Sequence, residues 1–252
     1  MNLSHVERYF ADFLSAMESG EGMIPLYQGQ DRKADRDIPQ TLHLPRNLFV
    51  IGTVNVDETT YMFSPKVLDR ANVLEFRVDE EEMAGFLGSP QKPDLNAIAG
   101  LGKEFGPEFV RLANDHEIRV PGEWAERFQA DMTALFKIFA RHHWEFGYRT
   151  AYEASRFAHF WHLLHGSDDD SYSNALDAVI VQKLMPKLHG SRAKLRPLLQ
   201  DLWGACLAGA QVGVPGDPSR AIDSALYPLS ADKVRRMWEL LHDHGFASFA
   251  EA

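Results

Sequence analysis

The chain has only one cysteine, Cys206, among its 252 residues. A single thiol cannot form a disulfide bond within the chain, and such scarcity is typical of a reducing compartment. The sequence also has no apolar run near the roughly 20 residues that a membrane-spanning helix needs. Its amino terminus has no basic-then-apolar signal segment. These absences exclude a disulfide-stabilised scaffold, and they predict a cytoplasmic protein that does not act with a membrane.

The charge balance is acidic, with a formal net charge of −10. Hydrophobic residues make up 45% of the chain and charged residues 25%, which is ordinary for a globular protein. An acidic chain is not a general nucleic-acid binder, so direct contact with DNA would need a local basic patch. We therefore expect any action on DNA to be indirect.

Histidine is plentiful, and His159, His162 and His165 recur every third residue. Zinc sites on one helix use histidines four residues apart, normally with cysteine or acidic partners. We therefore predict no metal site and interpret these side chains as packing residues. A metalloenzyme built on this histidine stripe is the alternative, and elemental analysis of the purified protein would test it.

Short apolar segments organise the beginning of the chain. Helical spacing predicts an amphipathic helix over Leu3–Met17, and two apolar pieces around a polar tip predict a β-hairpin over Met23–His43. The run Leu48–Val54 is apolar without in/out alternation. This pattern predicts a strand that is buried on both faces, as in a parallel sheet.

A short helix and a second strand are expected next. Pro65 suits the first turn of a helix, Ser64 can cap it, and we expect this helix to carry Arg70. The run Val73–Val78 then predicts a further strand.

The chain becomes almost entirely helical after about residue 80. The acidic run Asp79–Glu82 opens a helix, and Gly88–Gly106 has the glycine and proline content of a surface loop. Further helices are expected over Pro107–Asn114, Pro121–His142, Thr150–Leu164, Ser173–Leu188, Ser191–Leu207 and Ser230–His244. The fold class is therefore α/β but mostly helical, with an α/β domain over residues 1–80 and a helical domain over residues 81–252.

Polar residues follow the strand Leu48–Val54 directly. Ligands of α/β sheets bind beyond the carboxyl ends of the strands. The side-chain amide of Asn55 could there bind a terminal phosphate oxygen and orient an attacking water, which is the kind of positioning that phosphoryl transfer requires. Asp57 lies on the same loop. The alternative is that both side chains only cap or turn the chain.

Arg70 is the second candidate, at the end of the sequence Leu68-Asp69-Arg70. A guanidinium group is permanently charged, planar and forked toward phosphate oxygens, so it suits a trigger residue in phosphoryl transfer. The alternative is a surface salt bridge with Asp69, which would contribute little.

Taken together, Ile51–Arg70 resembles the sensor-1 strand and arginine-finger helix of AAA+ nucleoside triphosphatases, with McrB-like restriction motors as the closest branch. The segment Phe146–Thr150 is similar to the sensor-2 segment of that family. The resemblance implies that Asn55 acts as sensor 1, that Arg70 reaches a neighbouring subunit's nucleotide, and that Arg149 binds the nucleotide of its own subunit. It also implies ATP or GTP with Mg²⁺ as cofactor, a ring of subunits that is expected to be a hexamer, and a nuclease partner that acts on DNA.

The sequence has no Gly-x-x-x-x-Gly-Lys-Ser/Thr run, which cradles the phosphates in such motors, and no Walker B Asp-Glu pair. Its opening, Met1–Phe10, resembles the segment that follows Walker B. The resemblance therefore implies the carboxyl-terminal portion of a motor module: a partial AAA+ core, with sensor-1 strand, finger helix and one further strand, and then a helical lid. We expect the isolated chain to be inactive. In the family's sheet order, Leu48–Val54 would lack both neighbouring strands.

A second hypothesis is a non-catalytic helical regulatory or interaction protein that keeps a degenerate AAA+ remnant. Such a protein could insert into rings of complete subunits and donate Arg70 without binding nucleotide. The coding DNA upstream of Met1 would discriminate between the two, because an in-frame Walker A and Walker B would favour the motor fragment.

Overall fold

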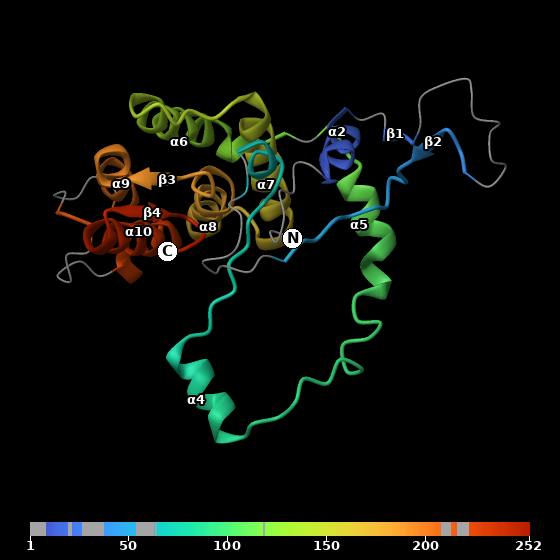
Figure 1. The fold of residues 1–252 in the computed structure, drawn as a ribbon, viewed down its shortest axis with the longest axis horizontal. Helices are drawn as coiled ribbons and strands as arrows, with labels where there is room; N and C mark the ends of the chain where they lie inside the picture. The colour runs from blue at the N-terminus through green and yellow to red at the C-terminus, as the bar shows by residue number, and fades with distance from the viewer. Residues whose placement is uncertain are drawn as a thin grey trace. The chain divides into compact units, whose positions relative to one another are not determined.

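Helices make up most of the computed structural model (Figure 1). The structure describes residues 9–19, 22–26, 38–53, 63, 65–117, 119–207, 213–215 and 222–252. The strands in these ranges are short and pair antiparallel. The mostly helical character that the sequence predicts is therefore confirmed. Within the described ranges, no helix combines the length and the apolar character that crossing a membrane would require.

The chain divides into two compact units. The first comprises Met1–Leu14, Gly52–Val73 and Ile118–Ala252, and the second comprises Ser15–Ile51 and Leu74–Glu117. Each unit therefore combines segments that are distant in the sequence. The expected division into domains over residues 1–80 and 81–252 stays a prediction.

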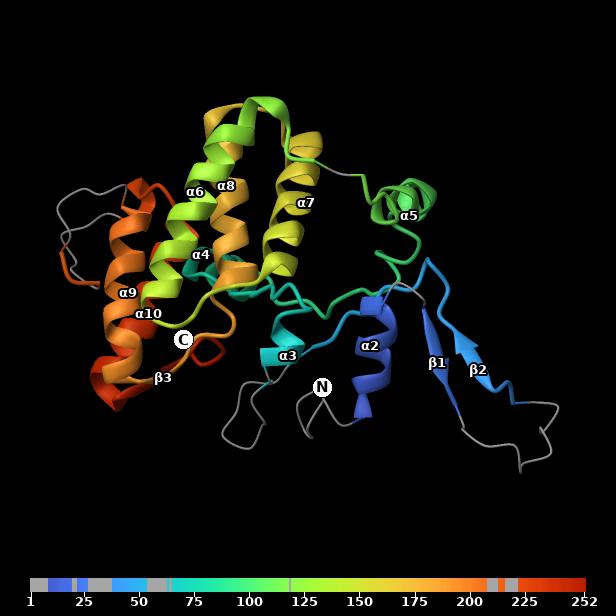
Figure 2. The same ribbon diagram turned by 90° about the horizontal axis from the view of Figure 1, so that it is seen from above.

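Long helices form most of the first unit. They are α6 (Gly122–Arg141), α7 (Tyr148–His165), α8 (Asp169–Val179), α9 (Arg192–Cys206) and α10 (Pro228–His244). These elements confirm the helices expected in this part of the chain. Helix α7 packs on α8, while α9 packs on both α6 and α10 (Figure 2).

Shorter elements complete the first unit. They are helix α3 (Pro65–Leu68), the π-helix η2 (Ile180–Leu184), the 3₁₀-helix η3 (Ile222–Ser224) and strands β3 (His189–Ser191) and β4 (Phe246–Ser248). The two strands pair antiparallel, with His189 opposite Ser248. Sequence analysis did not predict them, because three residues are too few to show a period of two.

Helix α6 shows why the sequence forms this arrangement. Its buried side chains recur every third or fourth residue and so lie on one face: Trp124, Phe128, Met132, Leu135 and Phe139. This face contributes to a core that also holds the fully buried Trp203 of α9. Cys206 lies in the same core. It therefore packs as a small hydrophobic residue.

The second unit contains fewer buried side chains. Its elements include β1 (Met23–Pro25), β2 (Thr41–His43), α4 (Glu80–Gly88), the 3₁₀-helix η1 (Lys103–Phe105) and α5 (Gly106–Ala113), while α2 (Ala11–Ser19) crosses between the two units. Strands β1 and β2 pair antiparallel and confirm the expected hairpin. Asp79 and Glu82 form a capping box that starts α4, as the acidic run predicts. Neither α4 nor α5 buries any residue.

The expected strand over Leu48–Val54 is wrong in the part that the structure describes. Residues 48–53 have no regular secondary structure, and Ile51 is 93% exposed. A parallel strand depends on hydrogen bonds to neighbouring strands, and no described strand pairs with this segment. Phe49 instead contacts the ring of Phe109 in α5, with ring centroids 4.8 Å apart.

Two further expectations need correction. Residues 71–79 form no strand, so the prediction for Val73–Val78 is wrong, and Phe76 is 92% exposed. The reason is the same, since no described strand pairs with this segment. Helix α3 ends at Leu68, so Arg70 follows it in a turn rather than lying within it. The Arg70 N–H donates to the carbonyl oxygen of Val67 at 3.0 Å and closes that turn.

Candidate functional site

The four residues predicted from the sequence fall into two groups. Asn55 and Asp57 lie outside the described residues, so their proposed roles stay predictions. Arg70 and Arg149 both belong to the first unit. Arg70 lies in the turn after α3, and Arg149 lies in the first turn of α7. Both side chains are partly buried.

The segment that carries Arg70 is attached to the helical part of its unit by a salt bridge. The ammonium group of Lys187 lies 2.7 Å from Oδ1 of Asp69, the residue before Arg70. The Lys187 side chain is 13% exposed and that of Asp69 is 42% exposed. The side chain of Asp69 thus reaches a residue that lies far away in the sequence.

Lys183 makes the second attachment. Its side chain is only 4% exposed, and its ammonium group donates to the carbonyl oxygen of Ala71 at 3.0 Å. It also forms a salt bridge with the carboxylate of Glu153 on α7. A buried ammonium group needs such partners, because removal from water is costly for an unpaired charge.

A backbone hydrogen bond makes the third attachment. The N–H of Val73 donates to the carbonyl oxygen of Gln182 at 3.0 Å. In a regular α-helix this carbonyl would accept from residue 186, but that residue is Pro186, which has no N–H. The chain forms the π-helix η2 at this point, where the Met185 N–H donates to Ile180 instead. The proline therefore leaves the Gln182 carbonyl available to Val73.

Arg149 and Glu153 lie four residues apart on α7, and so they occupy one face of the helix. Because Glu153 contacts Lys183, and Lys183 contacts Ala71, a single buried lysine joins the helix of Arg149 to the segment of Arg70. Arginine in the first turn of a helix adds its charge to the positive end of the helix dipole. This end of α7 is therefore chemically suited to an anion such as a phosphate group.

Sequence reasoning missed Glu153, Lys183 and Lys187. The two lysines lie within residues 181–191, where the sequence analysis identified no candidate site residue. Lys183 lies in the π-helix η2 and Lys187 lies in the turn that follows it, so helical spacing does not relate the two lysines. Glu153 was not singled out either, although the structure pairs it with Lys183.

The histidine stripe of α7 makes packing and polar contacts. His162 Nε2 lies 2.5 Å from Oε1 of Glu123, and the His162 ring meets Trp124 edge-on. His159 Nδ1 lies 3.0 Å from the carbonyl oxygen of Arg119. These contacts agree with the packing interpretation. In the part of the chain that the structure describes, no cluster of three or more His, Cys, Asp or Glu side chains could hold a metal ion.

The buried thiol of Cys206 and the hydroxyl groups of Tyr172 and Tyr227 are not activated as nucleophiles. Burial raises the pKa of the Cys206 thiol, and the nearby Asp177 carboxylate raises it further. Burial likewise raises the pKa of the hydroxyl group of Tyr172, which donates to Asp131 at 2.8 Å. The pKa of Tyr227 is raised chiefly by burial as well. All three groups therefore stay protonated near neutral pH.

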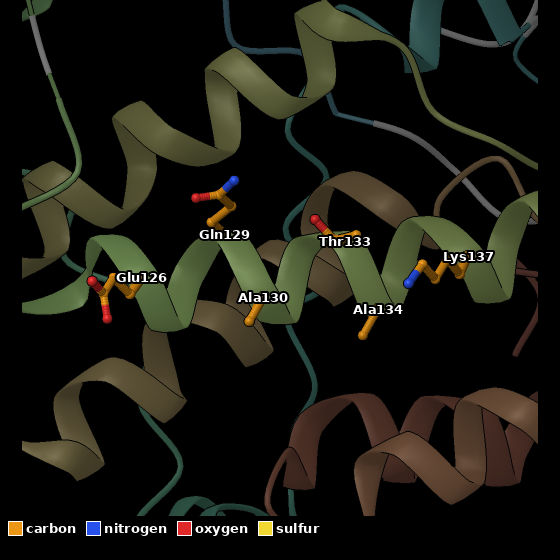
Figure 3. Close-up of a pocket in the computed structure, with 6 residues that line it drawn as sticks. All are labelled: Glu126, Gln129, Ala130, Thr133, Ala134 and Lys137. Atoms are coloured by element: carbon orange, nitrogen blue, oxygen red, sulfur yellow. The ribbon is translucent and has the colours of Figure 1, made fainter.

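A surface hollow of about 460 Å³ lies along α6 (Figure 3). Its six lining residues come from this one helix, and all are exposed: Glu126, Gln129, Ala130, Thr133, Ala134 and Lys137. The charged residues Glu126 and Lys137 lie at its two ends, roughly 16 Å apart along the helix axis. They cannot converge on one small ligand, so this hollow is not a candidate site.

Comparison with known proteins gave one match. A family model with the description "Domain of unknown function (DUF8727)" matches residues 103–246. The matched range covers the helices α6 to α10 and the π-helix with Lys183, but it does not include Arg70. No curated protein and no solved structure was found to be similar to this chain.

Proposed function

Since this chain belongs to the family of the domain of unknown function DUF8727, we propose a function for it from its own residues. We propose that it is the sensing and triggering part of a McrB-like AAA+ nucleoside triphosphatase that acts in DNA restriction. Asn55 would be sensor 1, Arg70 the arginine finger and Arg149 the sensor-2 residue, with Asp57 beside the nucleotide. The phosphate-binding loop would come from sequence outside these 252 residues.

The observation that best supports this proposal is the exposure of two apolar segments in the second unit. Leu48, Phe49 and Val50 are 40%, 44% and 42% exposed, and Ile51 is 93% exposed. In the segment 74–78, Leu74, Phe76 and Val78 are 60%, 92% and 66% exposed.

Globular domains normally bury such residues, and continuous apolar runs of this kind suit strands inside a parallel sheet. The proposed motor core accounts for their exposure. A Walker A strand of the complete core would lie between the segment Leu48–Ile51 and the segment that contains Phe76, and it would cover both.

Helix α7 and the Arg70 segment offer further support. Arg149 lies at the positive end of a helix, where a phosphate group is favoured. Arg70 lies on a short turn whose neighbours Asp69 and Ala71 are held by Lys187 and Lys183. A residue that must reach a neighbouring subunit's nucleotide benefits from such fixed placement, because transition-state stabilisation depends on geometry.

In the complete assembly, the nucleotide would be ATP or GTP with Mg²⁺, bound by subunits of a ring that is expected to be a hexamer. Arg70 would stabilise the charge that develops on the transferred phosphoryl group in a neighbour's site. Such fingers contribute about 10³–10⁵ in rate. The ring would drive a nuclease partner, and so contact with DNA would be indirect for this chain.

A first experiment tests the missing phosphate cradle. The purified 252-residue chain is titrated with ATP and with GTP in the presence of Mg²⁺, and calorimetry measures the binding. We expect no binding at micromolar concentration, because the chain has no Walker A run. Clear micromolar affinity for either nucleotide would contradict the proposal.

A second experiment tests Arg70 itself. The chain is mixed with a McrB-like subunit that has intact Walker A and Walker B motifs, and GTP and ATP hydrolysis are measured. We expect the chain to raise the hydrolysis rate, and Arg70→Ala to abolish that increase. Arg111→Ala is the matched control, since Arg111 is an exposed arginine of α5 that pairs with Glu108. Equal stimulation by the Arg70→Ala chain would contradict the finger role.

The alternative is a non-catalytic helical regulatory or interaction protein with a degenerate AAA+ remnant. The family match favours it in one respect, because residues 103–246 include the helical core but neither Asn55 nor Arg70. A regulator would bind the rings of complete subunits and change their activity equally with or without Arg70. An in-frame Walker A and Walker B upstream of Met1 in the coding DNA would favour the motor fragment instead.

A further inference from the structure

We infer that Lys183 and Lys187 are positioning residues that attach the Arg70 segment to the helical part of the first unit and couple it to α7. The roles of Arg70 as finger and Arg149 as sensor 2 rest on the proposed function. The attachment itself is a separate physical claim that involves no nucleotide.

The position of the two lysines is what carries this inference. Lys187 holds the side chain of Asp69, and Lys183 holds the backbone carbonyl of Ala71. Arg70 lies between these two attachment points, so the chain is anchored through a side chain before it and through the backbone after it. A side chain that is fixed in this way samples fewer directions, and the entropy cost of reaching a target is lower.

Burial makes the Lys183 attachment specific. Its side chain is 4% exposed. Among the described residues, the carboxylate of Glu153 neutralises its charge, and the carbonyl oxygen of Ala71 accepts a hydrogen bond from it. If one partner moves away, the ammonium group loses part of what compensates its burial. The positions of α7 and of the Arg70 segment are therefore linked energetically through this one group.

Through Lys183, a movement of α7 can be transmitted to the segment that carries Arg70. An anion bound at the first turn of α7 would pull on Arg149, which lies one turn before Glu153. A shift of Glu153 would reach Ala71 through Lys183, and so it would reach the backbone beside Arg70. The same chain could thus sense its own nucleotide and adjust the finger that it presents to its neighbour.

Hydrogen exchange of the full chain, followed by mass spectrometry, tests the attachment. We expect Lys187→Met to raise the exchange rate of amides in residues 67–73 at least tenfold, with α8 and α9 unchanged. The conservative variant Lys187→Arg should keep the slow exchange. The charge-swapped pair Asp69→Lys with Lys187→Asp should restore it. Unchanged exchange in Lys187→Met would overturn the attachment.

A double-mutant cycle tests the coupling through Lys183. Glu153→Gln is expected to accelerate exchange in residues 67–73 when Lys183 is present, and to have no additional effect in Lys183→Met. Additive effects of the two substitutions would overturn the coupling. Because Lys183→Met could affect folding, the thermal unfolding midpoint of each variant is measured, and Lys183→Arg serves as a second variant that keeps the charge.

The mixed-ring hydrolysis assay tests the positioning of Arg70. Lys187→Met should lower kcat about tenfold at unchanged KM, because it disturbs the trigger and not the nucleotide site. Faster exchange with unchanged kcat would overturn the positioning role. If the wild-type chain does not stimulate hydrolysis at all, the proposed function fails, while the exchange results still decide whether the attachment exists.

Discussion

Asp177 holds the first turn of α10 through Ser230. Its Oδ1 atom accepts hydrogen bonds from the Ser230 N–H at 2.8 Å and from the Ser230 hydroxyl group at 2.5 Å. Its Oδ2 atom accepts from the N–H of Leu229 at 2.8 Å. Asp177 belongs to α8, so its buried carboxylate both caps α10 and joins two helices of the core.

We predict that Asp177→Ala lowers the free energy of unfolding by about 3 kcal/mol, because the two buried donors of Ser230 and the partly buried N–H of Leu229 lose their acceptor. Ser230→Ala should lower it by only about 1 kcal/mol, since the backbone bonds to Asp177 remain. Urea unfolding followed by circular dichroism measures both values. A loss below about 0.5 kcal/mol in Asp177→Ala would show that water replaces the carboxylate.

The same carboxylate predicts a pH dependence. Burial raises the pKa of Asp177, and this effect exceeds the lowering by the Ser230 hydroxyl and the two backbone N–H groups. The folded chain therefore binds the proton more tightly than the unfolded chain, whose carboxyl pKa is about 3.9. The contribution of Asp177 to stability is largest below that pH and falls as the pH rises through the raised pKa.

Urea unfolding at several pH values between 4 and 7 tests this dependence. The difference in unfolding free energy between wild type and Asp177→Asn should fall as pH increases and then level off. Asp232→Asn is the opposite control. Burial raises the pKa of Asp232, but the hydrogen bond from Arg235 and the charge of Arg236 lower it more. Its contribution is present above the unfolded carboxyl pKa of about 3.9 and is lost only as pH falls below that value, so it should stay nearly constant between pH 4 and 7. A rising difference for Asp177 would contradict the prediction.

The helices were predictable because their signal is local. The five buried side chains of α6 repeat within a single segment, and the capping box of Asp79 and Glu82 lies within four residues. Neither feature depends on which other segment packs against the helix. The predicted helices that correspond to α6, α7, α9 and α10 differ from the observed ones only at their ends, whereas the helix predicted over Ser173–Leu188 is divided into α8 and the π-helix η2 and ends at Leu184.

The strands were not predictable in the same way. Strand formation depends on partners, and apolar composition alone does not supply them, as residues 48–53 and 71–79 show. The hairpin of β1 and β2 was found because its two strands are close in sequence. By contrast, β3 and β4 are short and distant from each other, and only the fold brings His189 opposite Ser248.

The candidate site was predictable in part. The motif that ends at Arg70 and the segment with Arg149 could be found from sequence, because each is a continuous stretch. The attachment through Lys183 could not, because it joins Ala71, Glu153 and Lys183 across three separate segments. The position of Pro186 indicates that the carbonyl of Gln182 has no donor from its own helix, but it does not indicate that Val73 is the donor.

The exposed apolar segments predict self-association. We expect the wild-type chain to bind the dye ANS and to form larger species as its concentration rises, and Phe76→Ser to reduce both effects. Phe76 is 92% exposed, so its replacement should change the unfolding free energy by no more than about 0.5 kcal/mol.

Leu164→Ser is the matched control, because Leu164 is 78% exposed but lies on the regular helix α7. It should leave dye binding and association nearly unchanged. Light scattering and ANS fluorescence give the measurement. If both variants reduce association equally, general surface hydrophobicity is the cause, and the segment that contains Phe76 has no special role.

Pro186 provides the last prediction. In the wild-type chain the carbonyl of Gln182 accepts a hydrogen bond from Val73. Pro186→Ala supplies a second N–H that can donate to the same carbonyl. The two donors then compete, so we expect the Val73 amide to exchange at least threefold faster in NMR measurements, although the core of the unit stays folded. Pro197→Ala is the control, because Pro197 lies within α9. Slow exchange at Val73 in Pro186→Ala would mean that the lysine attachments hold the segment without this hydrogen bond.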